Sequence, residues 1–225
     1  MKIPRIIHRI WLGGEPLRDD SQQYGETWRN HHPGWEIRLW TEDDLPAFGL
    51  TDALKRGRHQ AERADVLRYE LLERFGGVYV DIDFECLRSL EPLLDEVEVF
   101  AALLMPERVS NGMLGAVPGH PLFERASREA ALRIGVGTIP SATGPPFFAQ
   151  LLKDFPEVTL FSPEKFFPYL WTENHRAHEH FPEAYAVHRW FGDGAKSWRH
   201  SPGGVPRETA AAQARSRTMT PKRTP

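Results

Sequence analysis

The chain has 225 residues, of which 40% are hydrophobic and 26% are charged, and its formal net charge is −3. This length suits one domain with a sizeable core, and the composition is that of an ordinary globular protein. The charge balance argues against a general nucleic-acid or membrane-surface role. The single cysteine, Cys86, excludes an internal disulfide and fits a reducing compartment; we expect it to be a small buried residue rather than a nucleophile.

The N-terminal stretch and the apolar runs indicate the cellular location of the protein. The N-terminal stretch MKIPRIIHRIWLGG is short and interrupted by His8 and Arg9, which is atypical of a signal peptide. No apolar run approaches the roughly 20 residues of a membrane span. We therefore expect a cytoplasmic protein without a transmembrane segment, with membrane-peripheral association as a variant. We predict a domain over residues 1–200 and a disordered basic tail over 201–225.

Apolar periodicity and turn residues predict alternating strands and helices along the chain. In the clearest helix, apolar residues recur at steps of three and four until Gly76 stops it. Strand after helix after strand implies a single α/β domain with a central, mostly parallel sheet. The expected strands cover 6–12, 35–39, 76–85, 97–104, 113–117, 158–161 and 186–190. The expected helices cover 21–30, a short segment beginning at Thr41, 61–75, 121–133 and a segment beginning at Pro145 or Pro146.

The stretch GGVYVDIDFE, residues 76–85, reads as one strand with an apolar face and an acidic face. Like charges on one strand face repel, and burying them unpaired is costly, so we expect a divalent cation to compensate. Asp81 and Asp83 would reach one cation at the carboxyl end of the strand, where open α/β sheets bind ligands. The alternative is a solvated edge strand with surface acids.

Two further groups have both a functional and a purely structural interpretation. Asp65 and Arg68 share a helix face, where they form either a surface ion pair or part of a ligand cleft beside the acids. Trp11 precedes Gly13 and Gly14, so it either stacks on a flat ring next to a close backbone approach or fills the core before an ordinary turn. Spacing alone leaves both interpretations of each group open.

The combination of IPRIIHRIWLGG with AERADVLRYELLERFGGVYVDID resembles the DXD-containing sugar transferases of glycosyltransferase family 32. That family includes yeast outer-chain mannosyltransferases and bacterial polysaccharide enzymes, and the pattern is also similar to the catalytic domain of large clostridial glucosylating toxins. The resemblance is strong over roughly 3–94 and looser over 111–198. It implies a Rossmann-like GT-A fold, a UDP- or GDP-linked sugar donor, a Mn²⁺ or Mg²⁺ ion, and retention at the anomeric carbon.

The resemblance also implies roles for residues in the first half. Asp83 matches the direct metal ligand, and Asp81 matches the aspartate that contacts the ribose and sugar and helps to hold the metal. Asp65 and Arg68 match the pair that grips the donor sugar. Tyr79 matches a tyrosine near the donor. Trp11 matches the tryptophan that stacks on the nucleotide base.

The second half carries weaker similarities. Asn111 resembles a residue lining the sugar pocket, and its alternative is a turn residue before Gly112. Thr143 lies in a segment that resembles the TGP turn of the family, and its alternative is a plain helix start. Ser197 and Trp198 resemble parts of a C-terminal loop that closes over the diphosphate. His188, from the same region, is expected to complete the metal site or to bind phosphate, although a lone histidine is more often structural.

One local pattern, HRAHEH, invites a different interpretation. His175, His178 and His180 have a spacing that would suit zinc, but no cysteine is near and no family motif matches. A solvated loop is the favoured interpretation.

The sequence therefore predicts a metal-dependent retaining hexosyltransferase of polysaccharide biosynthesis, acting on a glycan or lipid-linked glycan acceptor and not on nucleic acid. Asp81, Asp83 and Arg68 are the expected catalytic residues, with positive charge from Arg68 placed where the leaving diphosphate develops negative charge. A glycoside hydrolase would need two carboxylates facing each other across the bond, which neighbours on one strand do not provide. A toxin-like enzyme with a protein acceptor and a metal-dependent carbohydrate-binding module are also compatible with the sequence.

Overall fold

The computed structural model describes residues 1–191. Its main feature is a six-stranded sheet in the order β2-β1-β3-β6-β5-β7, in which only β6 runs against its neighbours. A second, antiparallel sheet pairs β4 with β8. The strands are β1 (Ile6–Ile10), β2 (Glu36–Trp40), β3 (Gly77–Val80), β4 (Phe84–Cys86), β5 (Val99–Met105), β6 (Arg108–Ala116), β7 (Thr159–Phe161) and β8 (Ala186–His188).

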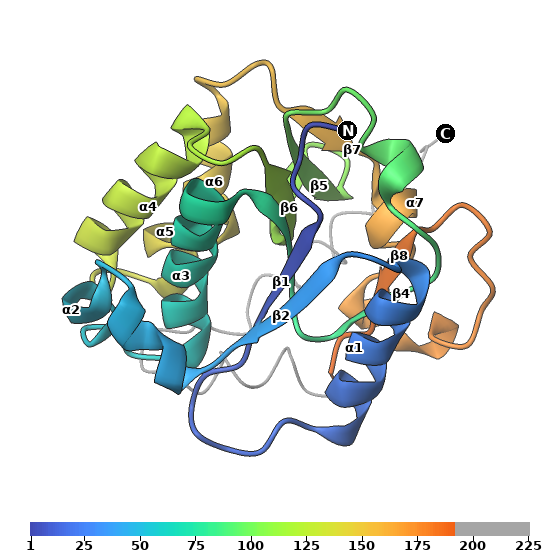
Figure 1. The fold of residues 1–225 in the computed structure, drawn as a ribbon, viewed down its shortest axis with the longest axis horizontal. Helices are drawn as coiled ribbons and strands as arrows, with labels where there is room; N and C mark the ends of the chain where they lie inside the picture. Colours follow the sequence, from blue (N-terminus) through green and yellow to red (C-terminus); the bar gives the residue numbers. More distant parts are fainter. Residues whose placement is uncertain (192–225) are drawn as a thin grey trace, which may run out of the picture. The chain divides into compact units, whose positions relative to one another are not determined.

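Helices flank the main sheet on two sides, as Figure 1 shows: α3, α4 and α6 lie on one side, and α1 and α7 lie with the small sheet on the other. The mostly parallel α/β sheet predicted from the sequence is confirmed. The helices are α1 (Asp19–His31), η1 (Glu42–Ala47), α2 (Thr51–Leu54), α3 (Gln60–Phe75), η2 (Glu91–Leu93), α4 (Pro121–Arg133), α5 (Ile139–Ala142), α6 (Pro145–Leu152), α7 (Pro163–Phe166) and η3 (Trp171–Arg176).

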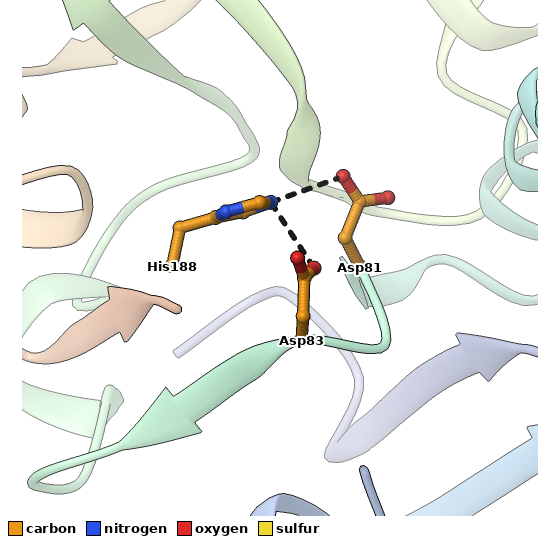
Figure 2. Close-up of side chains that lie close together, drawn as sticks. All are labelled: Asp81, Asp83 and His188. Atoms are coloured by element: carbon orange, nitrogen blue, oxygen red, sulfur yellow. Dashed lines mark ion pairs between the residues drawn. The ribbon is translucent and has the colours of Figure 1, made fainter. Parts of the chain in front are cut away.

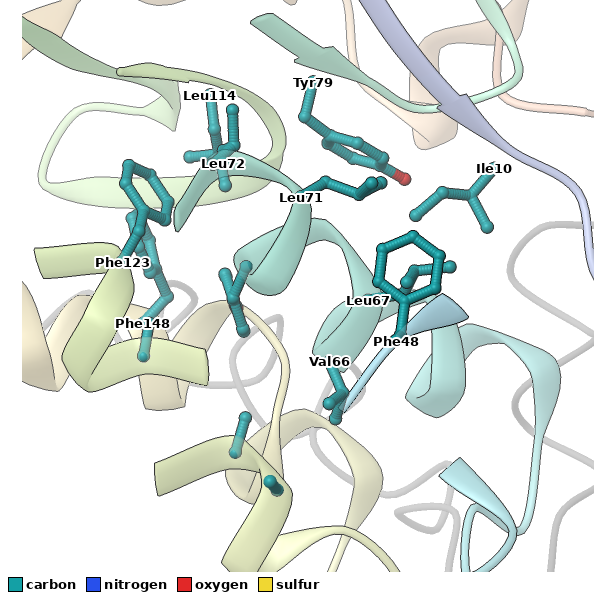
Figure 3. Close-up of a cluster of buried hydrophobic side chains, with 14 of the residues drawn as sticks. Ile10, Phe48, Val66, Leu67, Leu71, Leu72, Tyr79, Leu114, Phe123 and Phe148 are labelled. Atoms are coloured by element: carbon teal, nitrogen blue, oxygen red, sulfur yellow. The ribbon is translucent and has the colours of Figure 1, made fainter. Parts of the chain in front are cut away.

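Two hydrophobic clusters form because successive strand residues point to opposite faces of the sheet. In β3, Val78 and Val80 enter the cluster beneath α1 and β4, whereas Tyr79 enters the cluster around α3. Figure 3 shows the second cluster, in which Leu67 and Leu71 of α3 pack among side chains from the sheet and from the helices behind it. Burial on both faces explains why the strands of this sheet read as apolar runs.

The connection from α3 to β3 depends on two glycines. Gly76 ends the helix with φ of 61°, and Gly77 begins the strand with φ of 85°. A Cβ on Gly77 would lie 2.6 Å from the carbonyl oxygen of Ile6, and one on Gly76 would lie 2.6 Å from the backbone nitrogen of Pro118. Glycine therefore allows β3 to lie against its neighbours immediately after the helix stops.

The prediction of one continuous strand over 76–85 is wrong. β3 ends at Val80, and the Phe84 amide closes a turn by donating to the Asp81 carbonyl oxygen at 3.2 Å. After this acidic turn (residues 81–84), Phe84–Cys86 leave the main sheet to pair with β8. The solvated-edge interpretation is also wrong, because β3 lies between β1 and β6 and is buried throughout.

The other predicted elements are present with small shifts at their ends, and α4 has the predicted bounds. Strand β6 is longer than expected and forms an antiparallel hairpin with β5. Cys86 is buried and unpaired as predicted, and burial raises the pKa of its thiol to about 12. Within residues 1–191, no helix has the length and apolar character that crossing a membrane requires. The tail predicted over 201–225 lies outside the described residues.

Candidate active site

Asp81 lies at the carboxyl edge of the main sheet, immediately after β3. Its backbone amide donates to the Gly112 carbonyl oxygen of β6 at 2.9 Å, so the sheet fixes its position. Its carboxylate accepts a hydrogen bond from the Tyr79 hydroxyl at 2.8 Å and lies 3.1 Å from Nη1 of Arg68. The side chain keeps 30% of its exposure, which leaves one side open to a ligand.

Asp83 and Asp81 both face His188. The Nε2 atom of His188 lies 3.1 Å from one oxygen of Asp83 and 3.7 Å from one oxygen of Asp81. Figure 2 shows the imidazole edge facing both carboxylates from the opposite side of the site. The second oxygen of Asp83 accepts from the Phe191 amide at 3.3 Å. Residues more than a hundred positions apart in the sequence thus form one cluster.

The small β4–β8 sheet places His188. Phe84 pairs with His188 in the strand register, and the two rings meet edge to face with centroids 4.7 Å apart. Phe167 stacks on the imidazole from another direction at 5.6 Å. The Arg189 amide also donates to the Asp83 carbonyl oxygen at 2.9 Å, which ties the end of β8 to the acidic turn.

Asp65 and Arg68 of α3 form a buried ion pair, and Arg68 connects this pair to Asp81. They are 6% and 5% exposed, and Nη2 of Arg68 lies 3.1 Å from an oxygen of Asp65. Arg68 also donates to the Asn111 carbonyl oxygen at 2.6 Å, and its guanidinium lies over the Tyr79 ring. The surface-ion-pair interpretation of Asp65 and Arg68 is wrong, because both side chains are buried beside the acidic turn.

Further buried donors hold the Asp65 carboxylate. Asn111 Nδ2 donates to one oxygen at 2.8 Å, and the Thr143 hydroxyl donates to the other at 3.0 Å. Asn111 also donates to the Tyr69 hydroxyl, which in turn donates to the Thr143 carbonyl oxygen. Asn111 lies within β6, so its interpretation as a turn residue is wrong. The prediction missed Tyr69, although its place one helical turn after Asp65 was the available signal.

The carboxyl groups have different pKa values because their charged partners differ. Burial works to raise the pKa of Asp81, but Arg68 and the hydrogen bonds from His188 and Tyr79 outweigh it and hold the pKa below its usual range. Burial and the nearby Asp81 charge raise the pKa of Asp83 despite His188. Burial raises the pKa of Asp65 to about 6, although Arg68 and its hydrogen-bond donors favour the carboxylate.

The Asp81, Asp83 and His188 ligand atoms lie within 4.8 Å of one another, which suits a single ion. Two carboxylates and an imidazole form a donor set for a hard or borderline divalent cation such as Mn²⁺ or Mg²⁺, with positions left for phosphate oxygens. Burial and the neighbouring Asp81 charge disfavour the ionised form of Asp83, and a bound cation would act against both. The residues therefore fit the ion that the resemblance implies.

Trp11 follows β1 at the same edge of the sheet and belongs to neither of the two large hydrophobic clusters. Its indole N–H donates to the Glu15 carbonyl oxygen at 2.6 Å. The amide of Gly13 donates to Glu42, whose two carboxylate oxygens each accept from Arg63 at 2.8 Å. This ion pair fixes the loop after Trp11, and that was not expected from the sequence.

Five predicted positions remain, two outside residues 1–191 and three within them. Ser197 and Trp198 lie outside the described residues. His175, His178 and His180 are exposed and take no part in the metal-type cluster found within residues 1–191. The solvated-loop interpretation of HRAHEH is therefore the one that the structure supports.

The Rossmann-like sheet with paired carboxylates at the carboxyl edge of an inner strand defines the GT-A class of nucleotide-sugar transferase folds. The fold comparison agrees. A structure named PaToxG glycosyltransferase matches with a TM-score of 0.55 and 16% identity, covering 68% of this chain and 70% of its own. The UDP-bound glycosyltransferase domain of the YGT toxin matches with a TM-score of 0.53 and 11% identity, covering 70% of this chain and 79% of its own.

Sequence comparison gives the family. Residues 18–100 match the family described as "Glycosyltransferase sugar-binding region containing DXD motif", and this region of the chain belongs to that family. Mannosyl phosphorylinositol ceramide synthase SUR1 of Saccharomyces cerevisiae is 32% identical over 164 residues, covering 68% of this chain and 42% of the relative. Inositol phosphoceramide mannosyltransferase 3 of Schizosaccharomyces pombe is 34% identical over 133 residues, covering 56% and 36%. The chain thus spans about two fifths of the length of these relatives.

Proposed function

We propose that the protein is a metal-dependent retaining glycosyltransferase that moves a hexose from a nucleotide-diphosphate sugar to a glycan or lipid-linked glycan. The observation that carries the proposal is the convergence of Asp81, Asp83 and His188 at the carboxyl edge of the sheet, beside the buried Arg68. Open α/β sheets bind ligands at this edge, and a cation beside a fixed guanidinium would place positive charge where a diphosphate leaves.

The chain's own residues divide the work. Asp81, Asp83 and His188 would hold the divalent cation, which when bound supplies positive charge for the leaving diphosphate. Asp65, held by Asn111 and Thr143, accepts hydroxyl hydrogens of the donor sugar. Arg68 keeps Asp81 ionised and adds positive charge beside it.

Recognition of the nucleotide part of the donor involves Trp11 and the loop that follows it. Trp11 offers a flat ring for the nucleotide base, on a loop fixed by the Glu42–Arg63 pair. Tyr79 supports the site by donating its hydroxyl hydrogen to Asp81 and does not contact the donor itself, because its side chain is 2% exposed.

The activities of the relatives bear on the choice of donor and acceptor. Those relatives are a mannosyl phosphorylinositol ceramide synthase and an inositol phosphoceramide mannosyltransferase, which supports a mannosyl donor and a lipid-linked acceptor for this chain. A toxin-like protein acceptor is the second candidate, favoured by the fold similarity to toxin domains. A glycoside hydrolase fits less well, because both carboxylates approach one His188 nitrogen and so lie on the same side of the site.

Thermal shift with a panel of UDP- and GDP-sugars tests the proposal, because a ligand that binds the native state raises its stability. We expect stabilisation by one donor class only when Mn²⁺ or Mg²⁺ is present, and release of the nucleoside diphosphate in an assay with a glycolipid acceptor. The Asp83→Ala variant is the control and should lose the metal-dependent shift while remaining folded. Stabilisation by free glycan without nucleotide would instead indicate a carbohydrate-binding module.

A further inference from the structure

Arg9 is a buried cation that the proposed reaction does not use. It lies in β1, whose sequence IIHRI contains three isoleucines and one histidine besides Arg9, and its side chain is 4% exposed. A guanidinium in such a place needs acceptors, because a buried charge without partners is strongly unfavourable. Its contacts therefore show what it does.

The acceptors of Arg9 connect three elements. One terminal nitrogen, Nη2, donates to the Ile82 carbonyl oxygen at 2.8 Å and to the Ser21 carbonyl oxygen of α1 at 2.7 Å. Ile82 is the residue between the two site carboxylates. The guanidinium from β1 thus binds the middle of the acidic turn and joins it to α1.

Helix α1 leaves room for this side chain. A Cβ on Gly25 would overlap Nη1 of Arg9, so any larger residue would displace the guanidinium. Gly25 and Ser21 lie one helical turn apart on the buried face of α1. A glycine within a helix interior weakens it, and the space needed by Arg9 accounts for this one.

The rest of the turn is fixed by ordinary contacts. The Trp28 indole donates to the Phe84 carbonyl oxygen at 2.9 Å, and the Cys86 amide donates to the Thr27 hydroxyl at 2.9 Å. These contacts hold β4 after the turn. Main-chain amides bind the carbonyl oxygens of Asp81 and Asp83, whereas the Ile82 carbonyl oxygen between them accepts from the Arg9 side chain. The peptide between Asp81 and Asp83 sets the direction of both carboxylates.

We propose that Arg9 is a positioning residue that holds the peptide between Asp81 and Asp83, so that both carboxylates face His188 in the arrangement that binds the cation. The inference rests on the proposed metal-dependent function. It assigns no contact with substrate to Arg9. The guanidinium acts through the Ile82 carbonyl oxygen and through the space left by Gly25.

Manganese binding to the purified full chain, followed by the electron paramagnetic resonance signal of free Mn²⁺, tests this inference without any turnover. Arg9→Met removes charge and donors at similar length and should weaken binding about tenfold, the size of effect typical of lost outer-shell partners. Arg9→Lys keeps one donor and the charge and should fall between. Gly25→Ala should weaken binding in the same direction, although intrinsic helix propensity favours alanine.

The matched control is Arg56→Met. Arg56 also donates from a guanidinium to a main-chain carbonyl oxygen, that of Ala131, away from the acidic turn. We expect wild-type manganese affinity in this variant. A merely structural role for Arg9 would lower the unfolding temperature but leave the manganese affinity of the folded molecules unchanged, and that result would overturn the inference.

The remaining outcomes separate the two proposals. If Arg9→Met does not fold, Gly25→Ala decides, and wild-type affinity in Gly25→Ala rejects the inference. If the wild-type protein binds neither manganese nor magnesium, the proposed function fails and the role of Arg9 fails with it. If the wild type binds manganese and folded Arg9→Met binds it equally well, only the role of Arg9 is rejected.

Discussion

Asp81 and Asp83 are two residues apart, yet their pKa values move in opposite directions. Arg68 and Tyr79 both contact Asp81, which offsets its burial, whereas the partners of the Asp83 carboxylate within residues 1–191 are His188 and the Phe191 amide. The two carboxylates therefore differ in what they do for the fold. Asp81 is part of a satisfied polar network, whereas burial and the Asp81 charge disfavour the ionised form of Asp83, which a bound cation would favour.

Two single substitutions separate these roles. Asp83→Asn should lower turnover by roughly a hundredfold or more, because it removes a metal ligand, with little change in the free energy of unfolding. Asp81→Asn should lower turnover as well, and in addition destabilise the fold by about 2 kcal/mol, because the buried Arg68 loses one of its two charged partners and keeps Asp65. Urea unfolding without metal, together with donor turnover, measures both. Equal stability losses in the two variants would contradict this division.

Among the helices and strands, periodicity predicts those whose ends are set by residues close in the sequence. The helix over 61–75 and the helix from Pro121 to Arg133 are visible in the sequence because each carries an apolar stripe and end signals. The acidic turn is not visible, because alternation simply continues through Ile82 and Phe84. Only the distant contacts of Arg9 and of β8 reveal that the strand stops at Val80.

The glycine pair between α3 and β3 gives a prediction at this scale. Gly77→Ala should lower the free energy of unfolding by about 3 kcal/mol, because the new Cβ would meet the Ile6 carbonyl oxygen as well as adopt a positive φ. Gly34→Ala is the control, since Gly34 has the same φ of 85° but nothing within 4 Å of an added Cβ. It should lose only about 1 kcal/mol. Urea unfolding of both variants measures the difference, and equal losses would show that close approach to β1 is unimportant.

For the whole molecule, sequence patterns predict the class of fold but not the order of its strands. The position of β6 between β3 and β5 depends on pairing across long sequence separations, which no local pattern encodes. The site follows the same division. Strand alternation predicts Asp81 and Asp83 as cation ligands, and the resemblance adds the roles of Asp65, Arg68 and His188. Arg9 and Tyr69 have partners that only the folded chain brings near.

His8 links the stability of the whole molecule to pH. It is fully buried in β1, where Nδ1 accepts the Trp40 indole N–H at 3.1 Å and Nε2 donates to the Gly76 carbonyl oxygen at 2.9 Å. Both contacts are made by the neutral ring. Burial therefore lowers the pKa of His8 to about 4, although the Gly76 carbonyl opposes the shift. His8 of the unfolded chain is protonated below about pH 6.5, whereas His8 of the folded chain is protonated only below about pH 4.

The stability that neutral His8 contributes is thus complete above pH 6.5 and is lost as the pH falls toward 4, by about 3 kcal/mol in total. Burial also lowers the pKa of His32 and His120, which adds in the same direction. The His8→Gln variant isolates the contribution of His8, because an amide accepts and donates without titrating. Urea unfolding between pH 7 and pH 4 should show a smaller loss in this variant than in the wild type. Parallel curves would mean that His8 is protonated in the folded state and that the fold tolerates its charge.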